Sequence, residues 1–320
     1  MPLADLLDDQ GFQAGLAVGA AALAVTWVVL APARAVTRRA TVPVAGLVMA
    51  TAGVVALDRA DAVTLLSDRL VAGLVLLALV PVLTRITLGR RRDTTAWSPF
   101  TIAAGTALAA VPGAWVVASA ASRVNDRDWI PALVLVTTVL GGTLVVDFDR
   151  ANARAGLGPV LLALGTFGMY TTLPDTEEIA ALVGVSLPLV LLAWPVAMTA
   201  LGVGSYPAVG LLCWVAAVDG RGRPGAAIGA TACLGVLLVE PVVRRALGAR
   251  VRTAPRPVSW GAVALTAIQA ATVAAAARIA GLETSTVRAV AAAGVILVVS
   301  ALGVALCQAP WHRRSPAPSS

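Results

Sequence analysis

Apolar residues along this chain come in long blocks separated by short polar connections, and not at the spacing of an amphipathic surface helix. Most blocks approach the roughly 20 residues that an α-helix needs to cross the hydrocarbon core of a bilayer. Transmembrane β-strands would instead appear as short segments of alternating character. The predicted fold is therefore an all-α, polytopic membrane bundle of eleven helices, near 12–31, 42–57, 66–88, 98–121, 130–146, 157–173, 179–201, 206–218, 226–243, 260–280 and 286–308.

The blocks leave no room for a second domain, because the longest polar connection is 244–259. We expect residues 1–311 to form one transmembrane domain and residues 312–320 to form a short disordered cytoplasmic tail. The block 206–218 is short for a full crossing, so a re-entrant or tilted helix is the alternative there. The first block is not predicted to be a cleaved signal peptide, because acidic rather than basic residues precede it.

Composition supports a membrane location and argues against nucleic-acid binding. Charged residues make up 13% of the chain, against roughly 25% in soluble domains, and the mean hydropathy is +0.87. The net charge of +7 comes from short arginine clusters beside the blocks, such as 90–92 and 242–252, without interleaved aromatic residues. Such clusters set topology and also contact anionic lipids of the inner leaflet. We therefore predict the lipid bilayer as a partner, and no nucleic acid.

The arginine distribution predicts the orientation, because positive charge is retained on the cytoplasmic side. With eleven crossings, sixteen of the 24 basic residues, all of them arginine, fall on one side and eight on the other. Only four of the 17 acidic residues lie on the arginine-rich side. This places the N-terminus outside and the C-terminus inside a plasma membrane, which we take to be bacterial. Removing 206–218 would put the arginine-rich loop 244–256 outside, so the charge count favours keeping it.

The chain lacks the side chains that several kinds of catalysis and metal binding require. His312 is the single histidine and there is no lysine, which excludes Ser–His and Cys–His pairs within the membrane, histidine zinc sites and a P-loop. Cys213, Cys233 and Cys307 are far apart and are interpreted as small packing residues. We predict no metal site and no cofactor.

An acidic connection interrupts the apolar chain between two predicted crossings. Asp175 precedes Glu178 by three residues, the spacing of a helix capping box, and Glu177 and Glu178 would complement the positive end of the following helix dipole. Tyr170 and Thr172 extend this polar cluster into the membrane. The cap is the simpler interpretation, and a vestibule for a cation or a polar head group is the alternative.

The helix that follows is rich in residues that break helices. Pro188 and Pro195 lie seven residues apart, on one face, and each removes a backbone hydrogen bond. Glycines precede Ser205 and Tyr206, at the start of the next block. Broken membrane helices often form the substrate site of a transporter. We place the candidate pathway along 182–210, with an ordinary proline kink as the alternative.

Two further polar positions lie deep in the predicted bundle. Gln269 has Thr266 and Thr272 within one turn on either side, and a polar stripe of this kind is expected to join helices or, alternatively, to contact a solute. Glu240 precedes Arg244 by four residues, which predicts a local ion pair. A proton-coupling carboxylate is the alternative for Glu240.

The segment Asp147-Phe148-Asp149 has the DxD form with which many nucleotide-sugar transferases hold a divalent metal. That motif normally belongs to a soluble α/β domain, for which this chain has no room. We interpret the segment as a charged turn at the cytoplasmic end of the block 130–146.

Three classes of function are compatible with these patterns. The number of crossings and the sparse deep polar groups favour a transporter or flippase-like carrier of a small polar or lipid-linked solute. A membrane-embedded transferase or lipid-processing enzyme of the cell envelope would need a carboxylate constellation that the sequence does not display. The third class is a non-catalytic membrane scaffold. Transport is our preferred prediction.

The predicted topology can be tested by cysteine labelling of intact cells. Thr176→Cys is expected to react with a membrane-impermeant thiol reagent, and Ala249→Cys is not, because the arginine-rich loop should be cytoplasmic. The native Cys213, Cys233 and Cys307 are first replaced by alanine. Labelling of position 249 from outside would contradict the eleven-helix topology.

Overall fold

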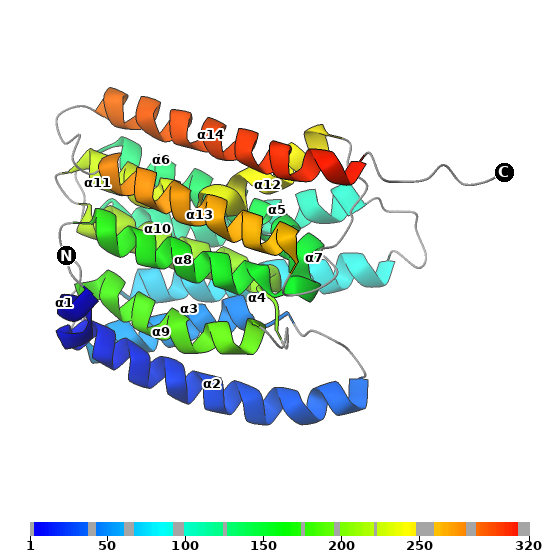
Figure 1. The fold of residues 1–320 in the computed structure, drawn as a ribbon. Helices are drawn as coiled ribbons and strands as arrows, with labels where there is room; N and C mark the ends of the chain where they lie inside the picture. The colour runs from blue at the N-terminus through cyan, green and yellow to red at the C-terminus, as the bar shows by residue number, and fades with distance from the viewer. Residues whose placement is uncertain are drawn as a thin grey trace.

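The structure is a computed structural model, and it describes residues 3–37, 43–60, 67–91, 99–123, 127–173, 177–194, 199–220, 223–247, 259–279 and 286–312. Within these ranges the chain is helical and contains no strand, and most helices run side by side along one axis (Figure 1). The first described helix, α1, and the end of the last one, α14, lie at opposite ends of the bundle. The elements are α1 (Leu3–Asp8), α2 (Gln10–Thr37), α3 (Ala45–Arg59), α4 (Asp68–Arg91), α5 (Pro99–Ala121), α6 (Trp129–Val136), the π-helix η2 (Thr137–Gly141), α7 (Gly142–Asn152), the 3₁₀ turn η3 (Ala153–Ala155), α8 (Leu157–Thr172), α9 (Glu177–Ala193), the 3₁₀ turn η4 (Gly202–Gly204), α10 (Ser205–Asp219), α11 (Pro224–Ala232), α12 (Gly235–Ala246), α13 (Trp260–Ile279) and α14 (Thr286–His312).

Seven of the described helical segments are long and apolar enough to cross a membrane, and an eighth is formed if α11 and α12 are one span bent by 54°. The chain is therefore a multi-pass helical membrane protein. Each predicted block contains a described helix, but α3, α8 and α9 have only 15, 16 and 17 residues. The count of eleven crossings and the orientation of the termini stay predictions. The seven segments are Gln10–Pro32, Asp68–Leu88, Phe100–Ala121, Trp129–Asn152, Gly202–Asp219, Trp260–Arg278 and Thr286–Gln308.

Two predicted boundaries are wrong. We expected a helix over 179–201, but α9 ends at Ala193 and the chain is irregular again before η4. We also expected a charged turn after residue 146, but α7 continues to Asn152. The helix continues because Phe148 and Asp149 are both buried against neighbouring elements, so the polar segment packs inside the protein.

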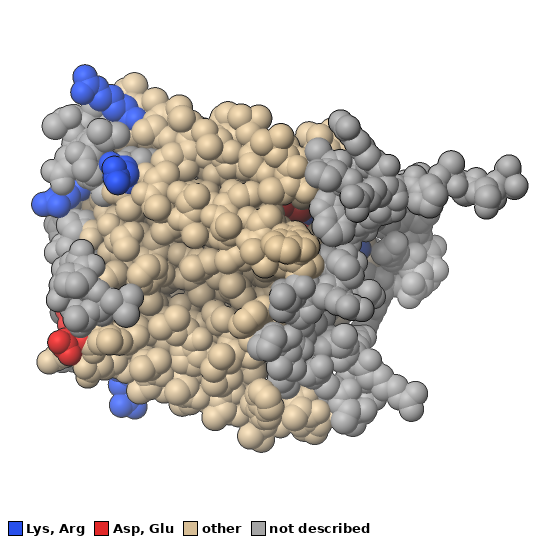
Figure 2. All heavy atoms as spheres, viewed as in Figure 1, with Lys and Arg blue, Asp and Glu red and all other residues tan. Residues whose placement is uncertain are grey.

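The surface of the bundle matches a lipid environment. Figure 2 shows a broad band without charged side chains, with arginine and acidic side chains at the end of the molecule where α1 lies and a few more partly visible toward the opposite end. Large apolar side chains are exposed on this surface, among them Val28, Leu108 and Leu306. In the membrane-crossing segment of α14, Thr286–Gln308, only 17% of the residues in its apolar stretch are buried. The outer helices therefore present their apolar faces to lipid rather than to a protein core.

At the centre of the bundle lies α10, the block whose crossing was least certain from sequence. Every residue of Ser205–Asp219 is buried, and with η4 the helix reaches 18 residues, of which 94% are buried. It packs against α3, α4, α5, α7 and α11. A helix surrounded by protein needs no apolar stripe on one face, which explains the small and mixed side chains of this block.

Glycines let α2 approach α9 at backbone distance. Gly11, Gly15 and Gly19 follow one another at every fourth position, so they form one face of α2. A Cβ on Gly19 would lie 2.8 Å from the carbonyl oxygen of Val185, and a Cβ on Gly15 would collide with the carbonyl of Ala181. The α2–α9 contact is therefore built on the small-residue spacing that is typical of membrane helices.

Enlarging the middle glycine is expected to separate these two helices. We predict that Gly15→Val lowers stability by about 1–3 kcal/mol, the usual cost of overpacking. The matched control is Gly294→Val on α14, where a Cβ meets no atom within 4 Å, and its change should stay within about 0.5 kcal/mol. Thermal unfolding of the two variants in detergent, followed by circular dichroism, measures the difference. Equal losses would contradict the close α2–α9 contact.

Candidate functional site

Asp149 is a carboxylate buried inside the bundle, with 3% of its surface exposed. Its Oδ2 accepts a hydrogen bond of 2.9 Å from the backbone N–H of Gly202, more than fifty residues away in the chain. The N–H of Leu201 also faces this carboxylate, yet Oδ1 has no hydrogen-bond partner among the described residues. Gly158 at the start of α8 leaves the space that Oδ1 occupies, because a Cβ there would collide with it.

The segment that meets Asp149 is an irregular stretch before α10. Gly202 has φ of +58°, a left-handed conformation that side chains other than glycine rarely adopt. Its carbonyl accepts a 2.7 Å hydrogen bond from the hydroxyl of Ser205. On the other side, Ala45 N–H donates to the carbonyl of Ala200 at 2.9 Å. The break is therefore held in place by α3, α7 and the first residue of α10.

Tyr206 extends the polar cluster from the break into the bundle. It is 1% exposed, and its hydroxyl lies 3.0 Å from Oγ1 of Thr143. The ring lies against Gly142, where a Cβ would be only 2.5 Å from the ring carbon Cδ1. These two positions on α7 directly follow the π-helix η2. A π-helical turn inserts an extra residue and is frequent at functional sites, and here it precedes the contact between α7 and Tyr206.

Arg85 supplies a positive charge on the α4 side of the same cluster. Its side chain is half-buried and lies within electrostatic range of Asp149, Tyr206 and Arg150. The Arg85 guanidinium is the cation that acts on the Asp149 carboxylate. We define the candidate site by Arg85, Thr143, Asp149 and Tyr206 with the backbone of Gly202; it combines a carboxylate, a cation and two hydroxyl groups in a largely apolar bundle.

A second charged cluster joins α7, α12 and α14. Nη2 of Arg244 lies 3.1 Å from Oδ2 of Asp147, and Nη2 of Arg245 lies 3.0 Å from the same oxygen. Nε of Arg244 is 3.2 Å from Oε1 of Glu240, at an angle too oblique for a hydrogen bond. Gln308 donates to that Oε1 at 3.0 Å. The ion pair expected from the four-residue spacing is present, and Asp147 enlarges it into a network.

The side chain of Gln269 binds backbone groups on both sides of the bend between α11 and α12. Its amide nitrogen donates to the carbonyl of Cys233 at 2.6 Å, and its oxygen accepts from the N–H of Val236 at 3.0 Å. Both backbone groups lie at the break between the two helices, where the regular backbone hydrogen bonds of an α-helix are interrupted. Thr172 of α8 lies beside the Cys233 thiol. The interhelical role preferred for Gln269 is confirmed by these bonds, and a solute contact there stays a prediction.

The predicted pathway residues do not form one site. Ser205 and Tyr206 lie with Asp149, near the start of α8. Tyr170 and Thr172 lie at the other end of α8, about 20 Å away at 1.5 Å per residue. Both are buried, and the Thr172 hydroxyl donates to the carbonyl of Met169. The structure thus separates the candidates near α10 from those near the acidic connection.

The remaining predicted residues have mainly helical roles or lie outside the described part of the chain. Glu177 and Glu178 occupy the first turn of α9, where they complement its dipole. Pro188 is buried inside α9, a helix that packs mainly on α2, α8 and α3. Asp175 and Pro195 lie outside the described residues. The vestibule and the paired prolines stay predictions.

Arg85, Thr143 and Asp149 were not predicted as members of a site. The fifth apolar block ends at Val146, before Asp149, and Arg85 was interpreted only as a topology signal. A helical projection would have found Asp149, because Val145, Phe148 and Asp149 share the buried face of α7. An acid on the apolar face of a helix indicates an interior partner.

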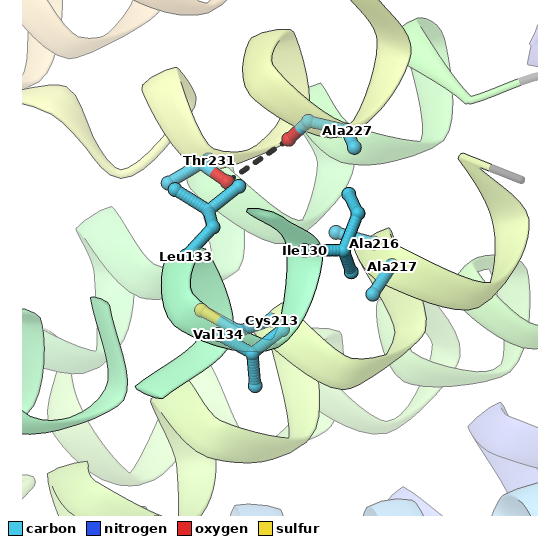
Figure 3. A pocket seen from close by; sticks show the side chains of 8 residues that line it. All are labelled: Ile130, Leu133, Val134, Cys213, Ala216, Ala217, Ala227 and Thr231. Carbon is cyan, nitrogen blue, oxygen red and sulfur yellow. Dashed lines mark hydrogen bonds between the residues drawn. The ribbon is translucent and has the colours of Figure 1, made fainter. Parts of the chain in front are cut away.

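A small cavity lies between α6, α10 and α11 (Figure 3). Its walls are apolar apart from Cys213 and the hydroxyl of Thr231, which donates to the carbonyl of Ala227 at 2.9 Å. The space is enough for about one water molecule. The cavity is therefore too small for a solute. Its lining residues are Ile130, Leu133, Val134, Cys213, Ala216, Ala217, Ala227 and Thr231.

No protein-family model and no curated protein matches the chain. The length and apolar character of the helices show a multi-pass membrane protein.

The charged network predicts unequal roles for two adjacent arginines. Arg244 is 9% exposed in its side chain and binds two acids, whereas Arg245 is 55% exposed and binds one. Arg244→Leu leaves the buried Glu240 without its cation and should cost about 3–5 kcal/mol. Arg245→Leu should cost about 0–1 kcal/mol, as an exposed pair does. Thermal unfolding in detergent measures both, and equal losses would contradict the buried network.

Proposed function

We propose that this protein is a carrier for a small polar or lipid-linked solute, and that the solute path passes the site of Arg85, Asp149 and Tyr206. The observation that carries the proposal is the buried Asp149 carboxylate at a helix break, with one oxygen bound to backbone and the other unpartnered among the described residues. Ionisable groups inside membrane bundles are expensive and usually mark ion or substrate pathways.

The helix break supports the same proposal. Transporters commonly bind solute where a membrane helix is interrupted, because the freed backbone groups and the helix ends can coordinate polar atoms. Here the break before α10 meets α3, α4, α7 and α8, so several helices converge on one point. Arg85 would attract a negative group of the solute, and Tyr206 and Thr143 can donate or accept hydrogen bonds.

The enzymatic alternative has less support in the described residues. Asp147 binds Arg244 and Arg245, whereas Asp149 binds the backbone of Gly202. The two acids of the DxD segment therefore serve different partners and do not converge on one ligand. A plasma-membrane location with the arginine-rich end at anionic lipids remains part of the carrier proposal.

Ligand-dependent stabilisation tests the carrier proposal. Purified protein in detergent is melted with a panel of amino acids, sugars, organic cations and phosphatidylglycerol. We expect one class to raise the melting temperature, since a ligand at a hundredfold its Kd adds about 2.7 kcal/mol. Asp149→Asn keeps the shape and the acceptor for Gly202, and should lose this stabilisation.

The matched control is Asp58→Asn, which changes an exposed acid near the end of α3 and should keep the full shift. The ligand class found in this way is then tested for uptake into proteoliposomes. A shift that persists unchanged in Asp149→Asn, or uptake that does, would remove Asp149 from the path. A panel without any stabilising class, together with proteoliposomes that take up none of its members, would contradict the carrier proposal.

A further inference from the structure

We propose that Glu240 is a proton-binding site, which exists either as a carboxylate paired with Arg244 or as a neutral acid paired with Gln308. The site lies where α7, α12 and α14 meet, in a group of side chains that we call the Glu240 cluster. The proton site is inferred from the contacts within this cluster, whereas its use to couple proton movement to solute movement rests on the proposed carrier function. The members of the cluster are Asp147, Glu240, Arg244, Arg245 and Gln308.

Three buried polar atoms of the Glu240 cluster make no hydrogen bond among the described residues: Oε2 of Glu240, Oε1 of Gln308 and Nε of Arg244. The three side chains are in direct contact, because Oε1 of Glu240 lies 3.0 Å from Nε2 of Gln308 and 3.2 Å from Nε of Arg244. Native proteins leave few buried polar atoms unsatisfied, and each one costs free energy. Two of these atoms are acceptors on groups that already share one hydrogen bond, so this contact lacks a donor.

A proton on Oε2 of Glu240 supplies that donor. A protonated carboxyl group has one O–H donor, and an amide oxygen is an acceptor. The O–H of Glu240 can therefore donate to Oε1 of Gln308 while the amide N–H of Gln308 still donates to Oε1 of Glu240. The last torsion of each side chain is soft, so the two groups can turn into this doubly bonded pair without a change of the helices.

Other small ligands fit the Glu240 cluster less well. A metal cation would meet the guanidinium groups of Arg244 and Arg245, and the described residues contain no group of three His, Cys, Asp or Glu side chains that could hold a metal ion. The cavity of Figure 3 lies between α6, α10 and α11, and none of its lining residues belongs to the cluster. A proton needs no cavity, and it is the ligand that we assign to Glu240.

The surroundings of Glu240 accommodate both of its charge states. Arg244 balances the ionised carboxylate. When Glu240 is neutral, Arg244 keeps Asp147 as its acid, because its Nη2 donates to Oδ2 of Asp147 at 3.1 Å and lies 3.3 Å from the carbonyl oxygen of that residue. Neutralising one partner of a buried ion pair would otherwise leave the second charge uncompensated. Asp147 thus allows Glu240 to gain and lose a proton within the folded bundle.

Few charges outside the Glu240 cluster act on this proton. The helices that pack on α12 are α7, α8, α13 and α14, and α8 has no charged residue. Asp149 is bound to Gly202, Arg278 lies in the last turn of α13, and Arg288 precedes Gln308 by twenty residues, or about 30 Å of helix. The charged side chains that these helices carry outside the cluster, among those described, are Asp149, Arg150, Arg278 and Arg288.

Asp147 connects the Glu240 cluster to the candidate site. It binds Arg244 from α7, and two residues later on the same helix Asp149 accepts the N–H of Gly202. When Glu240 is neutral, Asp147 is the one described acid that still attracts Arg244, so the attraction between α7 and α12 depends on the proton. In a carrier, this dependence would let the proton on Glu240 shift α7 and, with it, the break before α10.

Infrared spectroscopy tests the proton site directly. Protein in lipid is titrated from acidic to alkaline buffer, and the C=O stretch of protonated carboxyl groups is followed, which is separate from the amide bands. We expect a band that is still present at neutral pH, where exposed carboxyl groups are ionised, and that disappears as base removes the proton. A wild-type spectrum without a protonated carboxyl band at neutral pH would overturn the proposal without any variant.

Two pairs of variants assign the band. Glu240→Gln should remove it, whereas the matched control Glu177→Gln, at an exposed acid in the first turn of α9, should keep it. Gln308→Met should shift the band to higher frequency, because the acid loses its amide partner, and Gln13→Met, at an exposed amide of α2, should leave it in place. A full band in Glu240→Gln would overturn the site, and an unshifted band in Gln308→Met would overturn the pairing with Gln308.

Uptake into proteoliposomes separates the proton site from its coupling role. With the solute class found for the carrier, a pH gradient should alter uptake by the wild type and not by Glu240→Gln. An equal response of both proteins would overturn the coupling. The infrared titration needs no solute, so a Glu240 band in a protein that neither binds nor transports any member of the panel would contradict the carrier proposal alone.

Discussion

Within an apolar bundle, each interruption of a helix must find hydrogen-bond partners inside the protein, since lipid offers none. Two interruptions in this chain are resolved by polar side chains from other helices. Asp149 accepts the N–H of Gly202 at the break before α10, and Gln269 binds both sides of the bend between α11 and α12. The few deep polar groups are therefore placed where the backbone would otherwise be unpaired.

The same requirement explains why α10 can be the central helix. Its first turn follows an irregular stretch that only a fully enclosed site tolerates, with Gly202 in a left-handed conformation beside Pro43. Glycines elsewhere bring surrounding helices close enough to enclose it, as at the contact of Gly46 with Gly204. The enclosed break then brings Asp149, Arg85 and Tyr206 together, and these residues carry the proposed function.

Much of the helical architecture was predictable, because apolar block length is a strong signal for membrane helices. The site was less accessible to sequence reasoning. Tyr206 was found through its neighbouring glycines, whereas Asp149 was assigned to a turn, because a helix that continues into polar sequence cannot be recognised by hydropathy alone. Its partners Arg85 and Gly202 are distant in the chain, and only the packing of α4, α7 and η4 brings them together.

The bend between α11 and α12 has a consequence for the order of assembly. No proline lies at the bend, between Ala232 and Gly235, and the partners that satisfy its open backbone groups come from α13, which is synthesised later. Before α13 is inserted, Gln269 cannot bind the open backbone groups of the bend. Because lipid offers them no hydrogen-bond partner, we expect a straight, fully hydrogen-bonded helix to be the more stable form of this segment at that stage. The bend thus depends on Gln269 of α13, a residue more than thirty positions later in the chain. We therefore expect α11 and α12 to reach their bent arrangement only after α13 has been synthesised and has packed against them.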